Sequence, residues 1–342
     1  MACSFLPHSF PCSPPADGAW RAGISLRIAV AGAGAIGREH LLRIQANPRC
    51  HVVAVADPSP DAAGLGFAHY RDVETMLARE TLDGAIVATP NHLHLPVANA
   101  LLANGVPTLV EKPVAESMES ADRLAAAVAG AGVPVLVGHH RRHSAALQKA
   151  REIIGGGALG RLLAVNATTL FHKPAAYFDA AWRRQPGGGP ILINLVHDVD
   201  TLRFLAGEVI AVQAASSNRR RGFQVEDTAA VLLEFASGAL GTILLSDATV
   251  AADSWEHTSG ENPVYPRDPS RDCLLLAGTR GSLAVPTMRL WTQDGAPSWT
   301  EPFVSERCPL PSVDPLARQL DHFCDVIAHR AAPLVSAADG AR

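Results

Sequence analysis

Residues 28–37 read Ile-Ala-Val-Ala-Gly-Ala-Gly-Ala-Ile-Gly, an apolar run that leads directly into three glycines at positions 32, 34 and 37. Such a run predicts a buried strand. The glycines then allow a tight turn, a close approach of the main chain to a phosphate, and close packing of the helix that follows. The first N–H groups of that helix face an anion. The stretch therefore predicts the strand, turn and helix of a dinucleotide-binding domain.

A second apolar run at 51–56 ends on Asp57, 20 residues after Gly37. An acidic residue at this distance accepts hydrogen bonds from an adenosine ribose in dinucleotide-binding proteins. Pro58 and Ser59 follow it, so no Arg stands there to receive a 2′-phosphate. The pattern favours NAD as the cofactor, with NADP as the alternative. The competing reading is an ordinary strand–helix–strand turn with a surface Asp.

The bulk composition limits the class of protein. The 342 residues suffice for two domains, and 48% hydrophobic with 18% charged residues is typical of a globular protein. A net charge of −4 gives no reason to expect nucleic acid or an anionic membrane as partner. No apolar run reaches the ~20 residues that span a bilayer. Six scattered cysteines without a C-x-x-C pair predict thiols in a reducing, cytoplasmic setting and no metal site. Residues 1–22 hold four prolines and are expected to form a disordered tail.

Residues 23–143 alternate short apolar runs with helical patterns. Runs of Val, Ile and Ala without polar alternation are typical of strands buried on both faces of a parallel sheet. This predicts an α/β domain with a doubly wound parallel sheet. The expected strands are 26–31, 51–56, 84–88, 106–111 and 133–137, and the expected helices are 36–46, 72–79, 93–104 and 117–129.

Residues 144–342 follow a different pattern, in which several strands succeed one another without helices between them. We predict a second domain of the α+β class with an open, mostly antiparallel sheet. Long loops are expected at 171–190 and 251–271. The expected strands are 161–170, 209–217, 226–235, 239–247, 272–278, 281–285 and 288–292, and the expected helices are 144–154, 191–205 and 315–329.

Polar residues end two predicted strands of the first domain, at the edge where a doubly wound sheet binds its ligands. Thr89-Pro90-Asn91 is suited to contact a ribose or nicotinamide, and His94 begins the next helix. Lys112 ends another strand. Partial burial beside an oxidised nicotinamide would lower the pKa of this Lys, so that it exchanges a proton with a substrate hydroxyl. The competing readings are helix capping or surface exposure for His94 and a surface position for Lys112.

A glycine run at 187–189 and Pro190 open a predicted helix of the second domain. On this helix Asn194 and His197 are three residues apart and therefore share a face. Such a face is suited to present a polyol-binding surface to the nicotinamide. The competing reading is a solvated helix face that carries His197 with Asp198 and Asp200.

Together these pieces resemble the glucose–fructose oxidoreductase/inositol dehydrogenase family (Gfo/Idh/MocA), in family order from about residue 26 to 330. The matching motifs are Gly32-Ala-Gly-Ala-Ile-Gly37, Ala54-Val-Ala-Asp57, Thr89-Pro-Asn-His-Leu-His94, Glu111-Lys-Pro113, Gly187-Gly-Gly189 with His197-Asp-Val-Asp200, and Gly278-Thr-Arg-Gly281. The resemblance implies an N-terminal Rossmann domain and a C-terminal domain whose outer sheet face pairs subunits into homodimers or homotetramers. It also implies oxidation or reduction of hydroxyl carbons of sugars, cyclitols and related compounds with NAD or NADP.

The resemblance further implies the site residues. The family's catalytic Lys maps onto Lys112 and its catalytic His onto His197. The Asp that usually stands four residues before that His is Ile193 here, and the usual Gly two residues before it is Leu195. Asn194 is expected to orient the substrate, because an Asn is no base at neutral pH. The residues expected at the cofactor are Gly32, Gly34, Ala35, Ile36, Gly37, Asp57, Thr89, Pro90, Asn91, His94, Glu111 and Lys112.

Three further side chains are candidates for the substrate. Arg141 or Arg142 occupies the place after the last N-terminal strand where the family often has an Arg that faces the site, and Arg141 is expected to bind substrate. Trp182 is suited to stack on a sugar face and Arg183 to bind a carboxylate or several hydroxyls. An acidic sugar becomes a candidate substrate if Arg183 faces the nicotinamide. The competing reading for the Trp182–Arg183 pair is packing between the domains.

We therefore predict an NAD(P)-dependent dehydrogenase that moves hydride between the nicotinamide and a hydroxyl carbon of a sugar, cyclitol or polyol, with Lys112, His197 and Asn194 as the catalytic residues. The alternative is a non-catalytic sensor that binds NAD(H) and a sugar-like ligand, which the loss of the usual Asp keeps open. Hydrolysis or elimination through a held NAD redox cycle, implied by the resemblance, is a third reading.

Overall fold

The computed structural model describes residues 25–342, so the tail predicted at 1–22 lies outside the described residues. The first sheet has six parallel strands in the order β3-β2-β1-β4-β5-β6. This order, which reverses at β1, confirms the predicted doubly wound Rossmann sheet. The strands are β1 (Leu26–Ala31), β2 (Cys50–Ala56), β3 (Ala68–Tyr70), β4 (Gly84–Val87), β5 (Thr108–Val110) and β6 (Val135–Val137).

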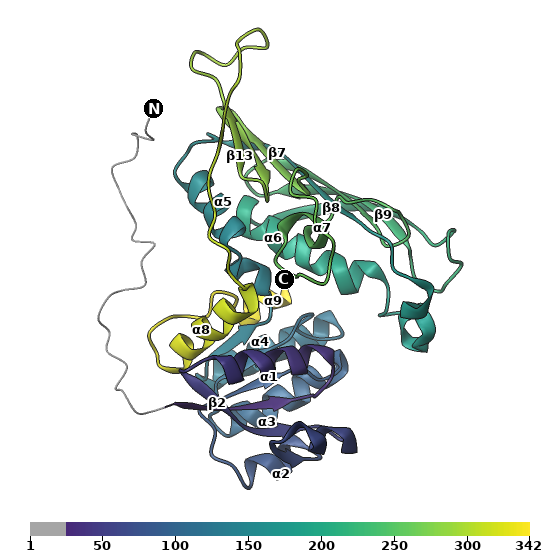
Figure 1. Cartoon of the computed structure of the whole chain (residues 1–342), viewed down its shortest axis with the longest axis vertical. Helices are drawn as coiled ribbons and strands as arrows, with labels where there is room; N and C mark the ends of the chain where they lie inside the picture. The colour runs from purple at the N-terminus through teal and green to yellow at the C-terminus, as the bar shows by residue number, and fades with distance from the viewer. Residues whose placement is uncertain (1–24) are drawn as a thin grey trace.

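Helices cover both faces of this sheet (Figure 1). Each of two helices begins where a side-chain oxygen accepts from a main-chain N–H of the first turn, Asp72 from Thr75 and Ser117 from Ser120. The helices are α1 (Ala35–Ala46), α2 (Val73–Leu77), α3 (His94–Ala103) and α4 (Met118–Ala131), with 3₁₀ turns η1 (Pro60–Leu65) and η2 (Asn91–Leu93). Strand β3 was not predicted, because three residues give too short a pattern to be seen in the sequence.

The second sheet has eight strands in the order β14-β13-β12-β11-β7-β10-β9-β8. Its pairs are antiparallel except for β7 with β10, so the sheet is mostly antiparallel, as predicted. The strands are β7 (Leu162–Leu170), β8 (Val209–Ser217), β9 (Thr228–Phe235), β10 (Leu240–Ser246), β11 (Leu274–Gly278), β12 (Gly281–Val285), β13 (Arg289–Thr292) and β14 (Val304–Arg307). The short edge strand β14 was not predicted.

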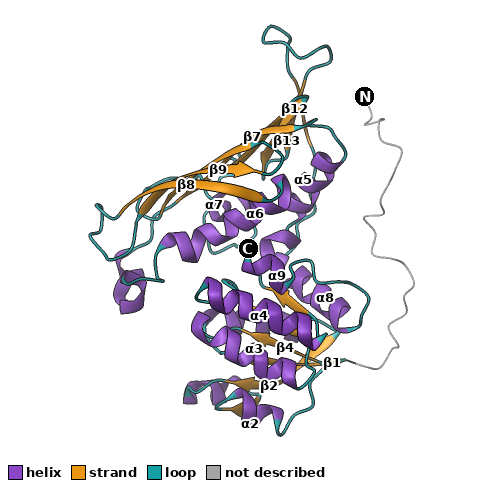
Figure 2. Cartoon of the chain, turned by 180° about the vertical axis from the view of Figure 1, so that it is seen from behind, coloured by secondary structure: helices purple, strands orange, loops and turns teal. Residues whose placement is uncertain are grey.

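The helices of the second layer lie on one face of this sheet, between it and the Rossmann layer (Figure 2). They are α5 (Ala145–Gly155), α6 (Val196–Ala206) and α7 (Trp255–Ser259). Two segments predicted as loops contain helical turns. Residues 171–190 form η4 (Ala175–Asp179) and η5 (Ala181–Arg184), and 251–271 contain α7.

The C-terminal segment returns to the first sheet. Helix α8 (Pro315–Ile327) places Leu320, Phe323 and Cys324 in the same core as β1 and β4. A Cβ on Gly84 of β4 would lie 2.6 Å from the Ile327 side chain, so that position is small because α8 packs against it. Helix α9 (Ala337–Ala341) packs beside α4. The domain boundary at 143/144 stays a prediction, and α8 and α9 belong spatially to the first core.

None of the helices in residues 25–342 combines the length and the apolar character needed to cross a membrane.

Candidate active site

The glycine turn between β1 and α1 leaves room for a ligand. A Cβ on Gly32, which has a φ of +96°, would lie 2.5 Å from the Ala88 carbonyl oxygen, and a Cβ on Gly37 would collide with the Gly32 carbonyl oxygen. A Cβ on Gly34 would meet no protein atom within 4 Å. Gly34 caps α1 without a side-chain hydrogen bond, so the first N–H groups remain for an anion. Packing therefore requires glycine at 32 and 37, while the space at 34 fits a pyrophosphate beside Ala35 and Ile36.

Asp57 lies directly beside this turn. Its Oδ2 atom accepts a hydrogen bond of 2.6 Å from the Ala33 N–H, and its Oδ1 atom accepts one of 2.8 Å from the Ser59 N–H. The carboxylate is thus fixed at the end of β2, next to the glycines, as an NAD ribose site requires.

The two strand ends that carry Thr89 and Lys112 are tied together by His94. The ring of this His is buried, with Nδ1 3.0 Å from the Pro113 carbonyl oxygen and Nε2 2.9 Å from the Thr89 carbonyl oxygen. Both nitrogens are therefore occupied by protein, and His94 orders the site instead of offering a free nitrogen to it. The Thr89 hydroxyl is buried without a partner among the described residues and is a candidate to contact a ligand, beside Pro90 and Asn91 at the start of η2.

Glu111 supports Lys112 from behind. Its Oε1 atom accepts a 2.8 Å hydrogen bond from His40 Nε2 on α1, and its Oε2 atom accepts from the main-chain N–H of Lys112. Burial raises the pKa of Glu111, but the hydrogen bond from His40 and the charges of His40 and Lys112 outweigh it, so the pKa lies below its usual value. The buried carboxylate is therefore ionised.

Lys112 reaches from the Rossmann layer to the second layer. Its Nζ atom donates a hydrogen bond of 3.2 Å to the Ile193 carbonyl oxygen. Ile193 lies in a π-helical turn, η6 (Ile191–Leu195), which leads into α6 and replaces the start of the predicted helix 191–205. Burial lowers the pKa of Lys112 below its ordinary value of 10.5; Glu111 opposes this shift, and the cations Arg141 and Lys173 reinforce it. Lys112 thus gives up its proton more readily than an exposed lysine does.

His197 follows the same turn, in the first residues of α6. It is buried, its ring centroid lies 5.2 Å from that of His140 and 6.3 Å from that of His139, and its Nδ1 atom has no partner among the described residues. Burial, together with the charges of Lys112 and Arg141, holds the pKa of His197 well below 6.5. A neutral imidazole with a nitrogen left for a ligand therefore lies beside the Lys112 ammonium.

Asp198 and Asp200 are buried, which excludes the solvated helix face as the reading of this segment. Asp198 accepts a hydrogen bond of 2.8 Å from Arg141 Nη1 and one of 2.6 Å from the Thr169 hydroxyl. Arg141 also donates from Nη2 to Glu256 on α7, at 2.8 Å, and Glu256 Oε2 is buried without a partner in the described chain. Arg141 therefore orders the site through two carboxylates, one from each flanking helix.

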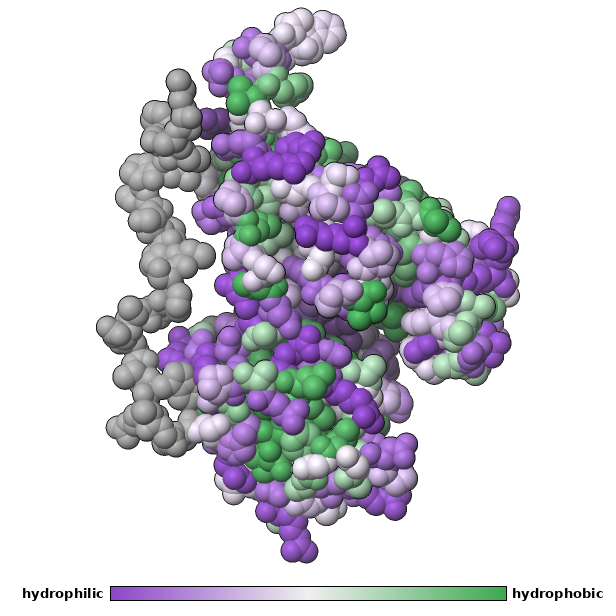
Figure 3. Space-filling model, in the orientation of Figure 1, coloured by the Kyte–Doolittle hydropathy of each residue, from purple (hydrophilic) through white to green (hydrophobic). Residues whose placement is uncertain are grey.

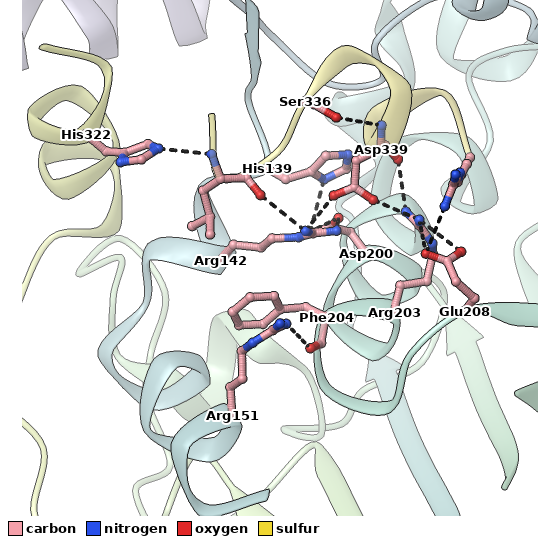
Figure 4. A network of polar contacts seen from close by, with 12 residues as sticks. His139, Arg142, Arg151, Asp200, Arg203, Phe204, Glu208, His322, Ser336 and Asp339 are labelled. Atoms are coloured by element: carbon pink, nitrogen blue, oxygen red, sulfur yellow. Dashed lines mark hydrogen bonds and ion pairs between the residues drawn. The ribbon is translucent and has the colours of Figure 1, made fainter. Parts of the chain in front are cut away.

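Arg142 binds the C-terminal segment. Figure 4 shows its guanidinium between Asp200 and Asp339, with His139 and Arg203 completing the network. The distances are 3.0 Å and 2.7 Å to Asp200 Oδ1 and 2.7 Å to Asp339 Oδ2. This network fixes α6, and with it His197, to the end of the chain.

The loop at 171–190 closes one side of the site. The lobe that it forms is at the right of Figure 1, and the space-filling view shows the surface hollowed between this lobe and the Rossmann layer (Figure 3). The Cζ atom of Arg183 lies 3.9 Å from the centroid of the Tyr177 ring. Its Nη1 atom donates a hydrogen bond of 2.6 Å to the Tyr177 carbonyl oxygen. Trp182 is 50% exposed, with Arg183 Cζ 5.3 Å from its ring centroid.

The sequence reasoning missed Lys173. Its Nζ atom donates a hydrogen bond of 2.7 Å to Asn194 Oδ1 and lies 3.3 Å from Asp247 Oδ2. The signal was present, because Lys173 follows the end of a strand, and the chain contains only three lysines. Glu256 was missed too, since nothing in a polar, Pro-containing segment marks one carboxylate as buried.

Two family models match the chain. One, described as an oxidoreductase family with an NAD-binding Rossmann fold, matches residues 26–139, and the GFO/IDH/MocA C-terminal domain matches residues 147–284. Among curated proteins, the rhizopine catabolism protein MocA of Rhizobium meliloti is 28% identical over 243 residues, 68% of this chain and 75% of that protein. Inositol 2-dehydrogenase 4 of Saccharopolyspora erythraea is 30% identical over 229 residues, 64% of this chain and 66% of that protein.

Solved structures share the fold over nearly the whole chain. An oxidoreductase from Agrobacterium radiobacter, crystallised with NAD+, L-tartaric acid and magnesium, has a TM-score of 0.77 at 18% identity and covers 93% of both chains. Levoglucosan dehydrogenase in complex with NADH and levoglucosan has a TM-score of 0.74 at 22% identity, with 93% of this chain and 94% of that chain covered. At these identities the likeness establishes the fold.

Proposed function

Because the chain belongs to the GFO/IDH/MocA family of NAD-binding oxidoreductases, we propose that it transfers hydride between the nicotinamide of NAD and a hydroxyl-bearing carbon of a sugar, cyclitol or related polyol. The observation that supports this most is the meeting of Lys112 and His197. They come from different layers of the fold, and both lie at the π-helical turn that holds Ile193 and Asn194.

The side chains have distinct roles in this proposal. Bound NAD+ supplies the hydride acceptor. Lys112, with its lowered pKa, takes the proton of the substrate hydroxyl while the carbon is oxidised, and returns it in the reverse direction. Neutral His197 hydrogen-bonds the same oxygen. Asn194 and Arg141 orient the substrate, Asn194 by its amide and Arg141 through the carboxylates it holds.

Ile193 supports catalysis over a sensor role. The main-chain carbonyl of Ile193 holds the Lys112 ammonium with no charge of its own, so Lys112 keeps its place without an Asp at position 193. The ammonium is therefore oriented by a hydrogen bond and still releases its proton. The loss of the Asp changes how the base is held and leaves Lys112 in place.

The test is the formation of NADH by the purified chain with NAD+ and a panel of sugars, cyclitols and polyols, read at the absorbance of the reduced nicotinamide. Turnover on any member supports the proposal. Tight NAD(H) binding without NADH formation on all members, in both reaction directions, would overturn it in favour of a sensor. Product analysis with catalytic amounts of NAD detects hydrolysis or elimination, which would also overturn it.

We also propose that the chain forms a homodimer or homotetramer through the outer face of its second sheet. Helices cover only the inner face, and exposed apolar side chains lie on the strands of the outer one. These are Leu232, Leu240, Leu244 and Leu275. Light scattering is expected to give two or four times 35.9 kDa, and Leu232→Glu with Leu244→Glu is expected to reduce the mass. A monomeric wild type would contradict this.

We also propose that the protein is cytoplasmic. The thiols of Cys50, Cys273 and Cys324 are buried and free, which fits a reducing compartment.

A further inference from the structure

Two of the chain's three lysines converge on one turn of the main chain. Lys112 Nζ donates to the Ile193 carbonyl oxygen, and Lys173 Nζ donates to Asn194 Oδ1 in the next residue. The two ammonium groups come from different sheets, since Lys112 follows β5 and Lys173 follows β7. Two cations at one turn of the main chain are more than a neutral polyol requires, because a hydroxyl compensates no charge.

The positive charge of Lys173 is only partly compensated by neighbouring negative charge. Its side chain is 9% exposed, and its hydrogen-bond acceptor, the Asn194 amide, is neutral. In the part of the chain that the structure describes, its one carboxylate contact is Asp247. Asp247 is shared with Arg221, which donates from Nη1 to the carboxylate and from Nη2 to the Asp247 carbonyl oxygen. Burial lowers the pKa of Lys173, and Asp247 opposes that shift. A single carboxylate therefore serves two buried cations.

Arg183 brings a further positive charge to the same place. Its Cζ atom lies 3.9 Å, and Lys173 Nζ 4.7 Å, from the centroid of the same Tyr177 ring. Among the contacts of the described residues, Arg183 has no carboxylate partner, and its buried Nε–H has no acceptor. An N–H donor buried without an acceptor costs free energy, which an incoming anion recovers.

We propose that the substrate is an acidic polyol, whose carboxylate binds between Lys173 and Arg183 while a hydroxyl of the same molecule lies at Lys112 and His197. This inference rests on the proposed function and names the substrate class of the same site. Lys173 supplies a point charge and Arg183 a planar set of donors, a pair that suits a carboxylate. In the reaction the C–H hydride goes to NAD+, the O–H proton goes to Lys112, and the carbinol becomes a ketone or aldehyde, so that the carboxylate is unchanged.

The test compares kcat/KM with NAD+ for matched pairs: glucuronate with glucose, galacturonate with galactose, and gluconate with glucitol. Glucose 6-phosphate forms a separate arm for a phosphate in place of the carboxylate. We expect wild type to prefer at least one acid over its neutral counterpart by tenfold or more, and Lys173→Gln to reduce that ratio at least tenfold. Lys149→Gln, on α5, is the matched control because Lys149 pairs with Glu152 outside the site, and it is expected to leave the ratio unchanged.

Arg183→Gln is the second variant, in case Lys173→Gln does not fold, and it is expected to reduce the ratio several-fold. Equilibrium binding of each acid to the NAD-loaded protein gives a readout without turnover, and Lys173→Gln is expected to weaken it tenfold or more. Equal turnover of acids and neutral partners, no loss of preference in either variant, or preference for the phosphate would each overturn the inference and leave the proposed function standing. Acid binding that Lys173→Gln abolishes, with no NADH formed from any compound, would support the anion site and overturn the proposed function.

Discussion

The Nζ atom of Lys112 donates its hydrogen bond to the main-chain carbonyl oxygen of Ile193, 3.2 Å away and in the other layer of the fold. A carbonyl orients the ammonium without adding a negative charge beside it. Burial therefore lowers the pKa of Lys112, although the Glu111 carboxylate behind it opposes the shift.

The first prediction concerns the pH dependence of oxidation. Because the pKa of Lys112 is lowered by burial, kcat/KM for the oxidation of the substrate is expected to rise with pH and to level off at a pH below 10.5. The rise reports loss of the proton from Lys112 in the free enzyme. Initial rates between pH 6 and 11 measure it. A flat profile over this range would contradict the assignment of Lys112 as the base.

The second prediction concerns the choice of cofactor. Asp57→Asn removes the charge that repels a 2′-phosphate and keeps the size of the side chain. The ratio of kcat/KM for NAD to that for NADP is expected to fall at least tenfold. Asp61→Asn, at the exposed start of η1, serves as the control. An unchanged ratio in Asp57→Asn would mean that this carboxylate does not select the cofactor.

The third prediction concerns stability in acid. Burial lowers the pKa of His143 from 6.5 to about 3. Between these values the unfolded chain binds a proton at this His and the folded chain does not. The free energy of unfolding is therefore expected to fall as the pH drops through this window, by up to about 1.4 kcal/mol per pH unit.

His143→Phe provides the check, because the buried Nε2 atom of His143 has no partner among the described residues. Urea unfolding at several pH values is expected to show a shallower slope for His143→Phe than for wild type between pH 6.5 and 4. Identical slopes would show that His143 is already protonated in the folded protein.

The fourth prediction concerns the network in Figure 4. Asp200→Asn leaves the buried Arg142 guanidinium without its two-point partner and is expected to lower the free energy of unfolding by about 3–5 kcal/mol. Glu152→Gln, which breaks the exposed Lys149 pair, is expected to cost less than about 1 kcal/mol. Denaturant unfolding compares the two. Equal and small effects would mean that the buried network does not anchor α6.

The sequence predicted the parts of the fold that depend on local patterns. The glycine turn, the buried parallel strands and the sheet without intervening helices each have a period or a turn signal, and the structure confirms them. The parallel pairing of β7 with β10 has no such signal, because the two strands are far apart in the sequence. The same holds for the return of α8 to the first core.

The site residues that could be predicted are those at strand ends and those in family motifs. Lys112, Asn194 and His197 do come together at η6, and Arg141 lies in their surroundings. The π-helical turn was invisible because its residues also fit an ordinary helix. Lys173 was not predicted, because the rule that ligands bind at the carboxyl ends of strands applies to doubly wound sheets, whereas β7 belongs to the mostly antiparallel sheet.

The most direct test of the account is the turnover of Lys112→Ala, with Lys149→Ala as the control. With a substrate that wild type oxidises, the account predicts a loss of kcat of about 10²–10⁴-fold in Lys112→Ala, while NADH affinity stays close to that of wild type. Turnover at the wild-type rate, with the cofactor bound, would contradict the claim that an ammonium and an imidazole from separate layers carry the proton transfer.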